Sequence, residues 1–148
     1  MHRTHSAPWP RRLALSIVLL ALAGCSLFVS HYDAAAYQQF TNLKAFHLKF
    51  LDDYREAQGR LFDEAKIRNT CDAGKLKFLE AKEYAQGKKD DTRVAAIQYL
   101  HNAFTKDCEL GSRKLFGAVY VQEQTGQLTV NYDLAIQGEL SRVGAPTK

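Results

Sequence analysis

Apolar residues recur at helical spacing along most of this chain, and the longest such pattern begins at Asp33. The positions on this pattern are Tyr37, Phe40, Leu43, Phe46, Phe50, Tyr54, Ala57, Leu61 and Ala65, with Phe78, Leu79 and Ala85 continuing the phase. Because residues three and four apart share one face of an α-helix, the pattern predicts an amphipathic helix. Asp33 offers an N-cap oxygen and precedes three alanines, the strongest helix formers. We therefore predict one long helix from Asp33 to Gln86, or the same helix broken once.

Two glycines decide whether this helix is continuous. Gly59 and Gly74 each cost about 1 kcal/mol relative to alanine, which weakens a helix without forbidding it. A break near Gly59 therefore stays open from the sequence. The end near Gln86 is better marked, because Gly87 suits a left-handed C-terminal position and the two lysines after it suit the negative end of the helix dipole.

A second helix is predicted after Asp90 and Asp91, whose carboxylates suit a helix N-terminus. Its apolar face comprises Val94, Ile97, Leu100, Phe104 and Cys108. The last segment, residues 115–140, fits a helix but also alternates like a strand at Leu128, Val130, Tyr132, Leu134 and Ile136. We expect a helix there, because the rest of the chain is helical and a lone hairpin is marginally stable.

The fold predicted for residues 33–143 is all-α. It is either an elongated helical hairpin or a three- to four-helix bundle built on the long N-terminal helix. No proline occurs from residue 11 to residue 145, which fits long helices. Removing residues 1–24 from the 148 leaves 124, enough for one domain with its own core.

The N-terminal segment has the composition of an export signal. Arg3, Arg11 and Arg12 precede an apolar run over residues 13–23. A run of about 11 residues is shorter than the roughly 20 that a membrane-spanning helix needs, so it fits the apolar region of a secretory signal. We predict that residues 1–24 are a signal peptide.

The four residues Leu22-Ala23-Gly24-Cys25 resemble the bacterial lipobox. The resemblance implies that Cys25 is diacylated on sulfur, becomes the mature N-terminus and is acylated again on nitrogen. Residues 25–32 are then the lipidated cysteine and a short tether, and residues 144–148 are a flexible tail. Ser26, in place of aspartate, implies sorting to the outer membrane where the enterobacterial rule applies.

Charge gives no support for nucleic-acid binding. The chain has 20 basic and 16 acidic residues, but three of the basic ones precede Cys25. The mature chain therefore has 17 basic and 16 acidic residues, a net charge of +1, and no basic stripe with interleaved aromatic residues.

Cys71 and Cys108 remain as a pair once Cys25 carries lipid. Exported proteins occupy an oxidising compartment, where such a pair tends to form a disulfide. If the helices ending near Gln86 and starting near Thr92 form an antiparallel hairpin, paired positions sum to about 179, as 71 and 108 do. We predict a Cys71–Cys108 disulfide in preference to a metal site, because no CxxC motif occurs and no histidine lies at ligand spacing.

The sequence contains no recognisable catalytic motif. Neither a Gly-x-Ser-x-Gly elbow nor a phosphate-binding loop occurs. His47 and His101 are the only histidines in the helical body, and without a Glu-x-x-His pair they are interpreted as edge or surface residues. The chain is therefore predicted not to be an enzyme and to use no cofactor or metal.

Two stretches of the predicted long helix carry a further resemblance. They are Tyr32-Asp33 with Ala36-Tyr37-Gln38-Gln39-Phe40-Thr41-Asn42-Leu43-Lys44, and Ala81-Lys82-Glu83-Tyr84-Ala85-Gln86-Gly87-Lys88. With the lipobox, they are similar to a group of small uncharacterised bacterial lipoproteins. The similarity implies a membrane lipoprotein but brings no known activity, and the cysteine pair is not part of the shared pattern.

The expected function is that of a membrane-anchored structural or protein-interaction module facing the periplasm. Its partners would be the membrane, through the lipid on Cys25, and either another protein or a second copy. Two alternatives stay open: a small-ligand binder using an aromatic-lined interior, and an inhibitor or immunity-type lipoprotein. An exposed apolar strip would favour the first reading, an enclosed cavity with a few convergent polar groups the second, and a charged loop patch the third.

Overall fold

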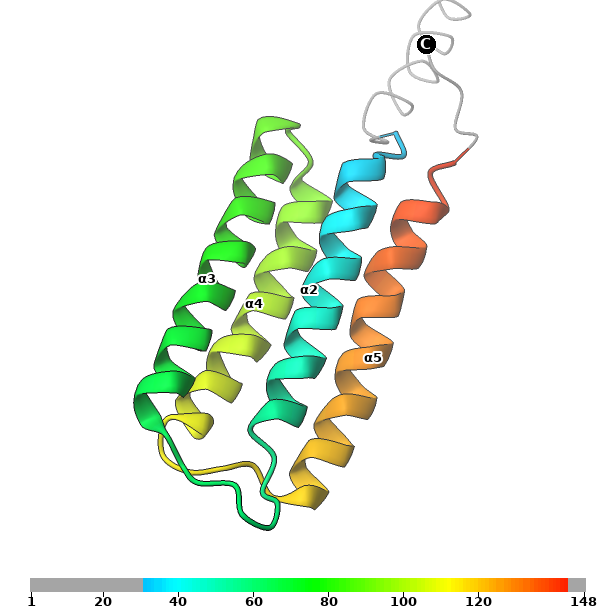
Figure 1. Ribbon diagram of the computed structural model, residues 1–148. Coiled ribbons are helices and arrows are strands. Elements are labelled where there is room, and N and C mark those ends of the chain that lie inside the picture. The colour runs from blue at the N-terminus through cyan, green and yellow to red at the C-terminus, as the bar shows by residue number, and fades with distance from the viewer. Residues whose placement is uncertain (1–30, 144–148) are drawn as a thin grey trace, which may run out of the picture. The chain divides into compact units, whose positions relative to one another are not determined.

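The computed structural model describes residues 31–143, which form an all-α bundle of four helices (Figure 1). The helices are α2 (Ala34–Asp53), α3 (Glu64–Gly87), α4 (Asp91–Gly111) and α5 (Ala118–Leu140). They run alternately down and up, so that each is antiparallel to the next along the chain. This confirms the predicted fold class and selects the four-helix bundle. It also confirms that residues 118–140 are helical and do not form a hairpin.

The prediction of one continuous helix from Asp33 to Gln86 is wrong, and the alternative with one break is confirmed. Helix α2 ends at Asp53, and α3 begins at Glu64 after a loop. Gly59 in this loop has a φ of 76°, in the left-handed region that glycine adopts most readily. Asp63 then caps α3 by accepting from the N–H of Lys66 at 3.0 Å. The break allows α3 to fold back beside α2.

The loop between α2 and α3 is fixed to the loop between α4 and α5. The N–H of Glu56 donates to the carbonyl of Phe116 at 2.7 Å, and the N–H of Phe116 donates to the carbonyl of Tyr54 at 2.9 Å. Phe116 is itself 1% exposed. Two backbone hydrogen bonds and one buried ring therefore close this end of the bundle.

The turn between α3 and α4 differs from the sequence prediction in one detail. Gly87 stays helical, and Lys89 instead takes the left-handed conformation, with φ of 55°. Asp90 then caps α4 by accepting from the N–H of Arg93 at 3.0 Å. The predicted helix end is thus confirmed, but its glycine does not make the turn.

Phe104 of α4 lies at the centre of the aromatic core. Its ring centroid lies 5.0 Å from His47, 5.3 Å from Phe50 and 5.4 Å from Phe78. Gly74 of α3 allows this packing, because a Cβ atom at this position would lie 2.2 Å from the Phe104 ring. The close approach of α3 to Phe104 therefore depends on the missing side chain.

The predicted disulfide is confirmed. Cys71 of α3 and Cys108 of α4 are bonded, with their Cα atoms 5.8 Å apart. The α3–α4 pair is the antiparallel hairpin from which the register was predicted. In the chain-entropy model, a loop with a sequence separation of 37 stabilises the fold by about 4 kcal/mol.

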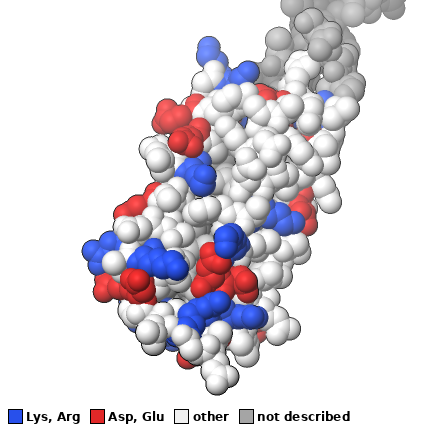
Figure 2. All heavy atoms as spheres, viewed as in Figure 1, with Lys and Arg blue, Asp and Glu red and all other residues white. Residues whose placement is uncertain are grey.

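The surface is unevenly charged. Figure 2 shows charged side chains gathered over α3 and the lower end of the bundle, while the upper half of α2 is largely uncharged. In α2 the first charged side chain after the cap is Lys44.

None of the helices in residues 31–143 is long and apolar enough to cross a membrane. The predicted signal peptide, the lipidated Cys25 with most of its tether, and the tail 144–148 lie outside the described residues.

We expect Gly74→Ala to destabilise the protein by about 1–3 kcal/mol, because the new methyl group would force the Phe104 ring out of a filled core. The better helix propensity of alanine, about 1 kcal/mol, offsets only part of this loss. Urea unfolding measures the difference in free energy.

Gly126→Ala is the matched control for this substitution. Gly126 lies inside α5, and a Cβ atom there would meet no atom within 4 Å. This variant should gain about 0.5–1 kcal/mol from helix propensity alone. If Gly74→Ala were as stable as Gly126→Ala, the close packing of Phe104 would not constrain the fold.

Candidate functional site

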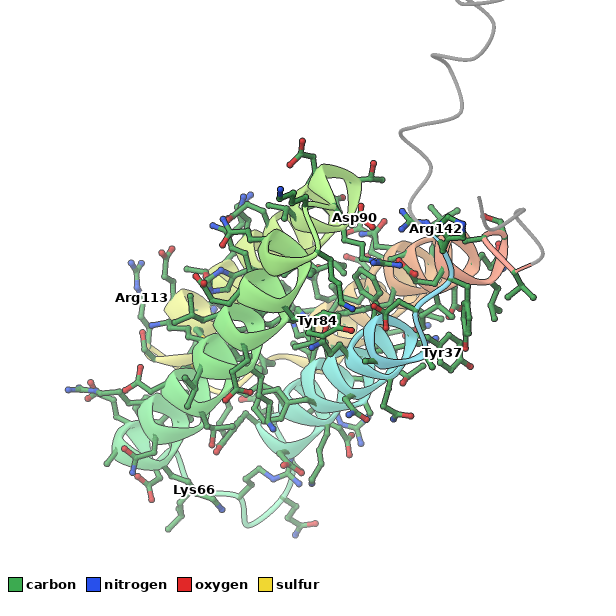
Figure 3. All side chains as sticks on the ribbon, turned by 90° about the horizontal axis from the view of Figure 1, so that it is seen from above. Tyr37, Lys66, Tyr84, Asp90, Arg113 and Arg142 are labelled. Carbon is green, nitrogen blue, oxygen red and sulfur yellow. A yellow bond between two sulfur atoms is a disulfide. The ribbon has the colours of Figure 1, made fainter. Side chains whose placement is uncertain are left out.

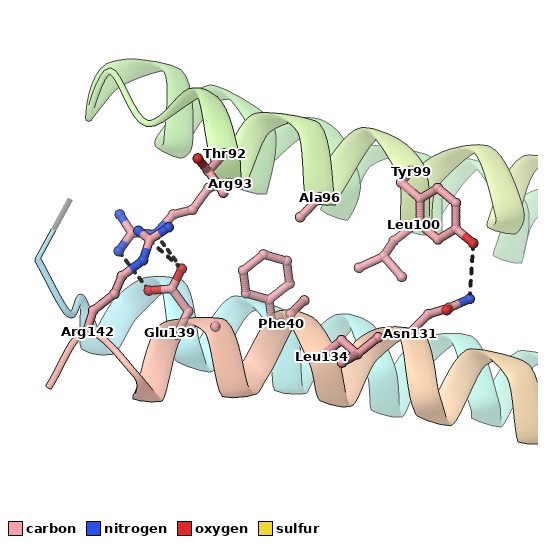
Figure 4. A pocket seen from close by; sticks show the side chains of 12 residues that line it. Phe40, Thr92, Arg93, Ala96, Tyr99, Leu100, Asn131, Leu134, Glu139 and Arg142 are labelled. Atoms are coloured by element: carbon pink, nitrogen blue, oxygen red, sulfur yellow. Dashed lines mark hydrogen bonds and ion pairs between the residues drawn. The ribbon is translucent and has the colours of Figure 1, made fainter. Parts of the chain in front are cut away.

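A groove of about 440 Å³ lies between α4 and α5 (Figure 4). Small residues form much of its walls: Ala96 on α4, and Ala135 and Gly138 on α5. Phe40 of α2 and Leu100 of α4, 2% and 1% exposed, form its floor. Because the small side chains do not fill the space between the two helices, a mostly apolar surface stays open.

Two exposed apolar side chains flank the groove. Tyr99 on α4 is 60% exposed, and Leu134 on α5 is 63% exposed. The Tyr99 hydroxyl accepts from the Asn131 amide at 3.4 Å, a long hydrogen bond on the surface. At this end of the groove, therefore, two polar groups joined only by a long hydrogen bond lie beside exposed apolar side chains.

The other end of the groove is a wall of buried charge. Arg93 is 2% exposed, and its guanidinium donates to both oxygens of Glu139, from Nε at 2.6 Å and from Nη2 at 2.7 Å. Arg93 Nη1 also lies 3.0 Å from Asp90 Oδ2, and Arg142 Nη1 donates to the same oxygen at 2.5 Å. Figure 3 looks down on this end, with Asp90 and Arg142 labelled. Two guanidinium groups thus face two carboxylates. Arg93 Nη1 also lies 4.0 Å from Asp33 Oδ2, and Lys88 Nζ lies 3.7 Å from the same oxygen, so the three cations and three carboxylates together carry no net charge.

This cluster also holds the start of α2. Arg93 Nη2 donates to the carbonyl of His31 at 2.9 Å, and the Tyr84 hydroxyl donates to Asp33 at 2.7 Å. Burial alone would raise the pKa of Asp33, but the Tyr84 hydroxyl and the N–H groups of Ala36 and Ala35 outweigh it, and the pKa is lowered. Asp33 is therefore ionised at neutral pH and remains an acceptor for the helix N-terminus.

A second polar cluster lies inside the bundle and overturns one prediction. His47 is not an edge or surface residue, since it is 0% exposed. Its Nε2 lies 2.7 Å from Asp107 Oδ2, and its Nδ1 lies 3.2 Å from the Tyr132 hydroxyl oxygen. Asp107, also fully buried, accepts further hydrogen bonds from the Tyr120 hydroxyl and the Gln124 amide.

The sequence contained a sign of this position. Phe40, Leu43, His47, Phe50 and Tyr54 follow a spacing of three and four residues, as core positions of packed helices do. All five are buried. The wider pattern that included Phe46 obscured this narrower stripe, which places His47 in the core.

The tyrosines of this cluster serve as hydrogen-bond partners. Burial raises the pKa of Tyr120 above its ordinary value, and the hydrogen bond to Asp107 raises it further. Burial and the charge of Asp107 likewise raise the pKa of Tyr132. Both phenols therefore keep their protons, which allows Tyr120 to donate to the carboxylate.

The His47–Asp107 pair resembles the base and orienting acid of a catalytic triad, but its environment is unsuited to catalysis. Both side chains are 0% exposed, so a substrate would have to displace core residues to reach them. In the described part of the chain, no group of three or more His, Cys, Asp or Glu side chains could hold a metal ion. The arrangement joins α2, α4 and α5 and so fixes their relative positions.

His101, the other predicted surface histidine, packs against α3. Its ring stacks on Phe78 with centroids 5.1 Å apart, and its Nε2 is buried with no hydrogen-bond partner among the described residues. Burial lowers the pKa of His101, and the charges of Lys82 and Lys75 lower it further.

Comparison of this chain with protein-family models, with curated proteins and with solved structures found no match.

We expect His47→Leu to cost about 3–5 kcal/mol of folding free energy, because it leaves the buried Asp107 carboxylate without its histidine partner. The Tyr132 hydroxyl would lose a partner as well. Urea unfolding at pH 7 measures this loss, and a value below about 1 kcal/mol would show that the cluster does not hold the helices together.

His101→Leu is the control, since it removes a histidine whose buried Nε2 has no partner in residues 31–143. It should leave stability at pH 7 nearly unchanged. Because the pKa of His101 is lowered in the folded protein, the wild type loses stability as pH falls below the ordinary value of 6.5. That part of the acid sensitivity should disappear in His101→Leu.

Proposed function

We propose that this protein is a lipid-anchored, non-catalytic module that faces the periplasm and acts through structure or binding. The observation that carries the proposal is the Leu22-Ala23-Gly24-Cys25 motif, which is soon followed by an independently packed bundle from Ala34. Stable anchoring needs at least two hydrophobic signals, and each buried methylene contributes about 0.8 kcal/mol. Three acyl chains on Cys25 would hold the bundle at the membrane without help from its own surface.

The geometry of the polar clusters supports a role without catalysis. The His47–Asp107 pair is closed to solvent, and the Arg93–Glu139 pair has its charges matched by buried partners. A substrate could reach His47 and Asp107 only by displacing core residues, because both side chains are fully buried.

A second candidate function, the binding of a small ligand, is favoured by the groove between α4 and α5. Its volume of about 440 Å³ falls in the range of roughly 300–1,000 Å³ that is typical of ligand sites. The site differs from the aromatic interior expected from the sequence, because buried rings such as Phe104 and Phe50 already fill that interior. The open space lies at the surface, where Ala96 and Gly138 face it.

Cys25→Ser should move the protein from the membrane fraction to the soluble fraction, because serine lacks the sulfur that is diacylated. Ser26→Ala, which keeps the cysteine, should leave it in the membrane. Mass spectrometry of the mature N-terminal peptide identifies the acyl groups directly, and an unmodified peptide containing Cys25 would contradict the proposal.

Residues 26–148 should show no turnover in broad hydrolase and transferase screens, because the His47–Asp107 pair is inaccessible and the sequence contains no recognisable catalytic motif. The measurement is product formation at high protein concentration. A turnover activity that was lost on substitution of His47 or His101 in a folded variant would contradict this expectation.

A further inference from the structure

The groove between α4 and α5 is held open by the structure on both sides. Arg93 and Glu139 join the two helices at one end of the bundle, and Asp107 with Tyr120 joins them toward the other. Between these polar contacts stand Ala96, Ala135 and Gly138, whose side chains are too small to close the gap. The groove is therefore largely preformed, which lowers the entropic cost of binding.

The groove is longer than it is wide. Its lining extends from Thr92 to Leu100 on α4 and from Asn131 to Glu139 on α5, with Arg142 just beyond the end of α5. At 1.5 Å per residue each helical stretch spans about 12 Å. Packed helices lie about 8–10 Å apart between axes, and their side chains narrow the opening further. An extended aliphatic chain fits this shape better than a compact fused ring.

The charges around the groove indicate which polar group a bound ligand would carry. At the charged end Arg93 and Arg142 face Asp90 and Glu139, and Lys88 faces Asp33 beside Arg93, so three cations balance three carboxylates and this end offers no net charge to an ionic ligand. At the opposite end of the groove, the Tyr99 hydroxyl and the Asn131 amide are joined by a 3.4 Å hydrogen bond that a ligand can replace. Hydroxyl or ester groups are the natural partners for such side chains.

We propose that the groove between α4 and α5 binds one aliphatic chain of an uncharged amphiphile, with the chain over Phe40 and Leu100 and the polar head beside Tyr99 and Asn131. The proposal rests on the ligand-binding function suggested above and does not require that Cys25 is lipidated. The occupant it commits to is a free, uncharged single-chain amphiphile of the monoacylglycerol type.

The test is a titration of the mature chain carrying Cys25→Ser, without acyl groups, with monoacylglycerols of six, eight, ten and twelve carbons. Nitrogen-15 NMR below the critical micelle concentration reports both the affinity and the residues affected. The affinity should rise about three- to fourfold with each added methylene until the groove is filled, and then level off. The largest shifts should map to α4 and α5 at the groove.

Two glycines on α5 supply a matched pair of variants. Both Gly138 and Gly126 are exposed, and a Cβ atom at either would meet no atom within 4 Å. Gly138→Leu places a side chain in the groove and should weaken binding at least tenfold. Gly126→Leu, on the same helix but away from the groove, should leave binding unchanged, and thermal unfolding of both variants verifies that they fold.

Three results would overturn the proposal. Equal affinity in Gly138→Leu and wild type would show that the amphiphile binds elsewhere. Tighter binding of dodecanoate or dodecylamine than of the uncharged probe would show that the head group was assigned wrongly. A dimer that dissociates in Gly138→Leu would show that a second copy covers the groove.

The controls separate this inference from the two functions proposed above. Binding of 1-naphthol in the groove, without binding of any monoacylglycerol, would support a ligand site but refute the aliphatic chain. Failure of all probes while Cys25 still directs the protein to the membrane would refute the ligand site and leave the anchoring proposal intact.

Discussion

A carboxylate removed from water must be surrounded by donors, and the arrangement around Asp107 meets this requirement. His47 reaches it from α2, and Tyr120 and Gln124 reach it from α5. The next residue, Cys108, is bonded to Cys71 of α3. One turn of α4 is therefore tied to each of the other three helices, and a shift of any helix by a turn would leave a buried charge unpaired or strain a covalent bond.

The charged cluster at Arg93 has a parallel role at the opposite end of α4. Arg93 is bonded to Glu139 of α5 and to the carbonyl of His31, while Asp33 accepts from Tyr84 of α3. Polar contacts thus set the spacing of α4 and α5 near both ends, and the apolar contacts between them are few where Ala96 and Gly138 lie. The groove exists because polar contacts hold α4 and α5 apart near both ends, while the residues between those contacts are too small to fill the space.

Much of the fold could be predicted from the sequence, because helical periodicity and caps are local properties. The Cys71–Cys108 bond was also predictable, since an antiparallel hairpin has a definite register. The loop after Asp53 was harder to place, because Ala57 and Leu61 continue the apolar period, although Leu61 is 86% exposed in the structure. The groove could not be predicted, because it depends on how residues of two helices are placed across a gap, and no local pattern contains that information.

The alternating direction of the helices has a mechanical consequence. The described chain enters the bundle at His31 and leaves it at Val143, and both lie at the same end (Figure 1). The two loops joined through Tyr54 and Phe116 lie at the other end, one helix length away, about 30 Å for the 20 residues of α2. A pull between the two chain ends would therefore load the Arg93 cluster first and peel α2 and α5 away from it, while the distant loops would bear little of the force.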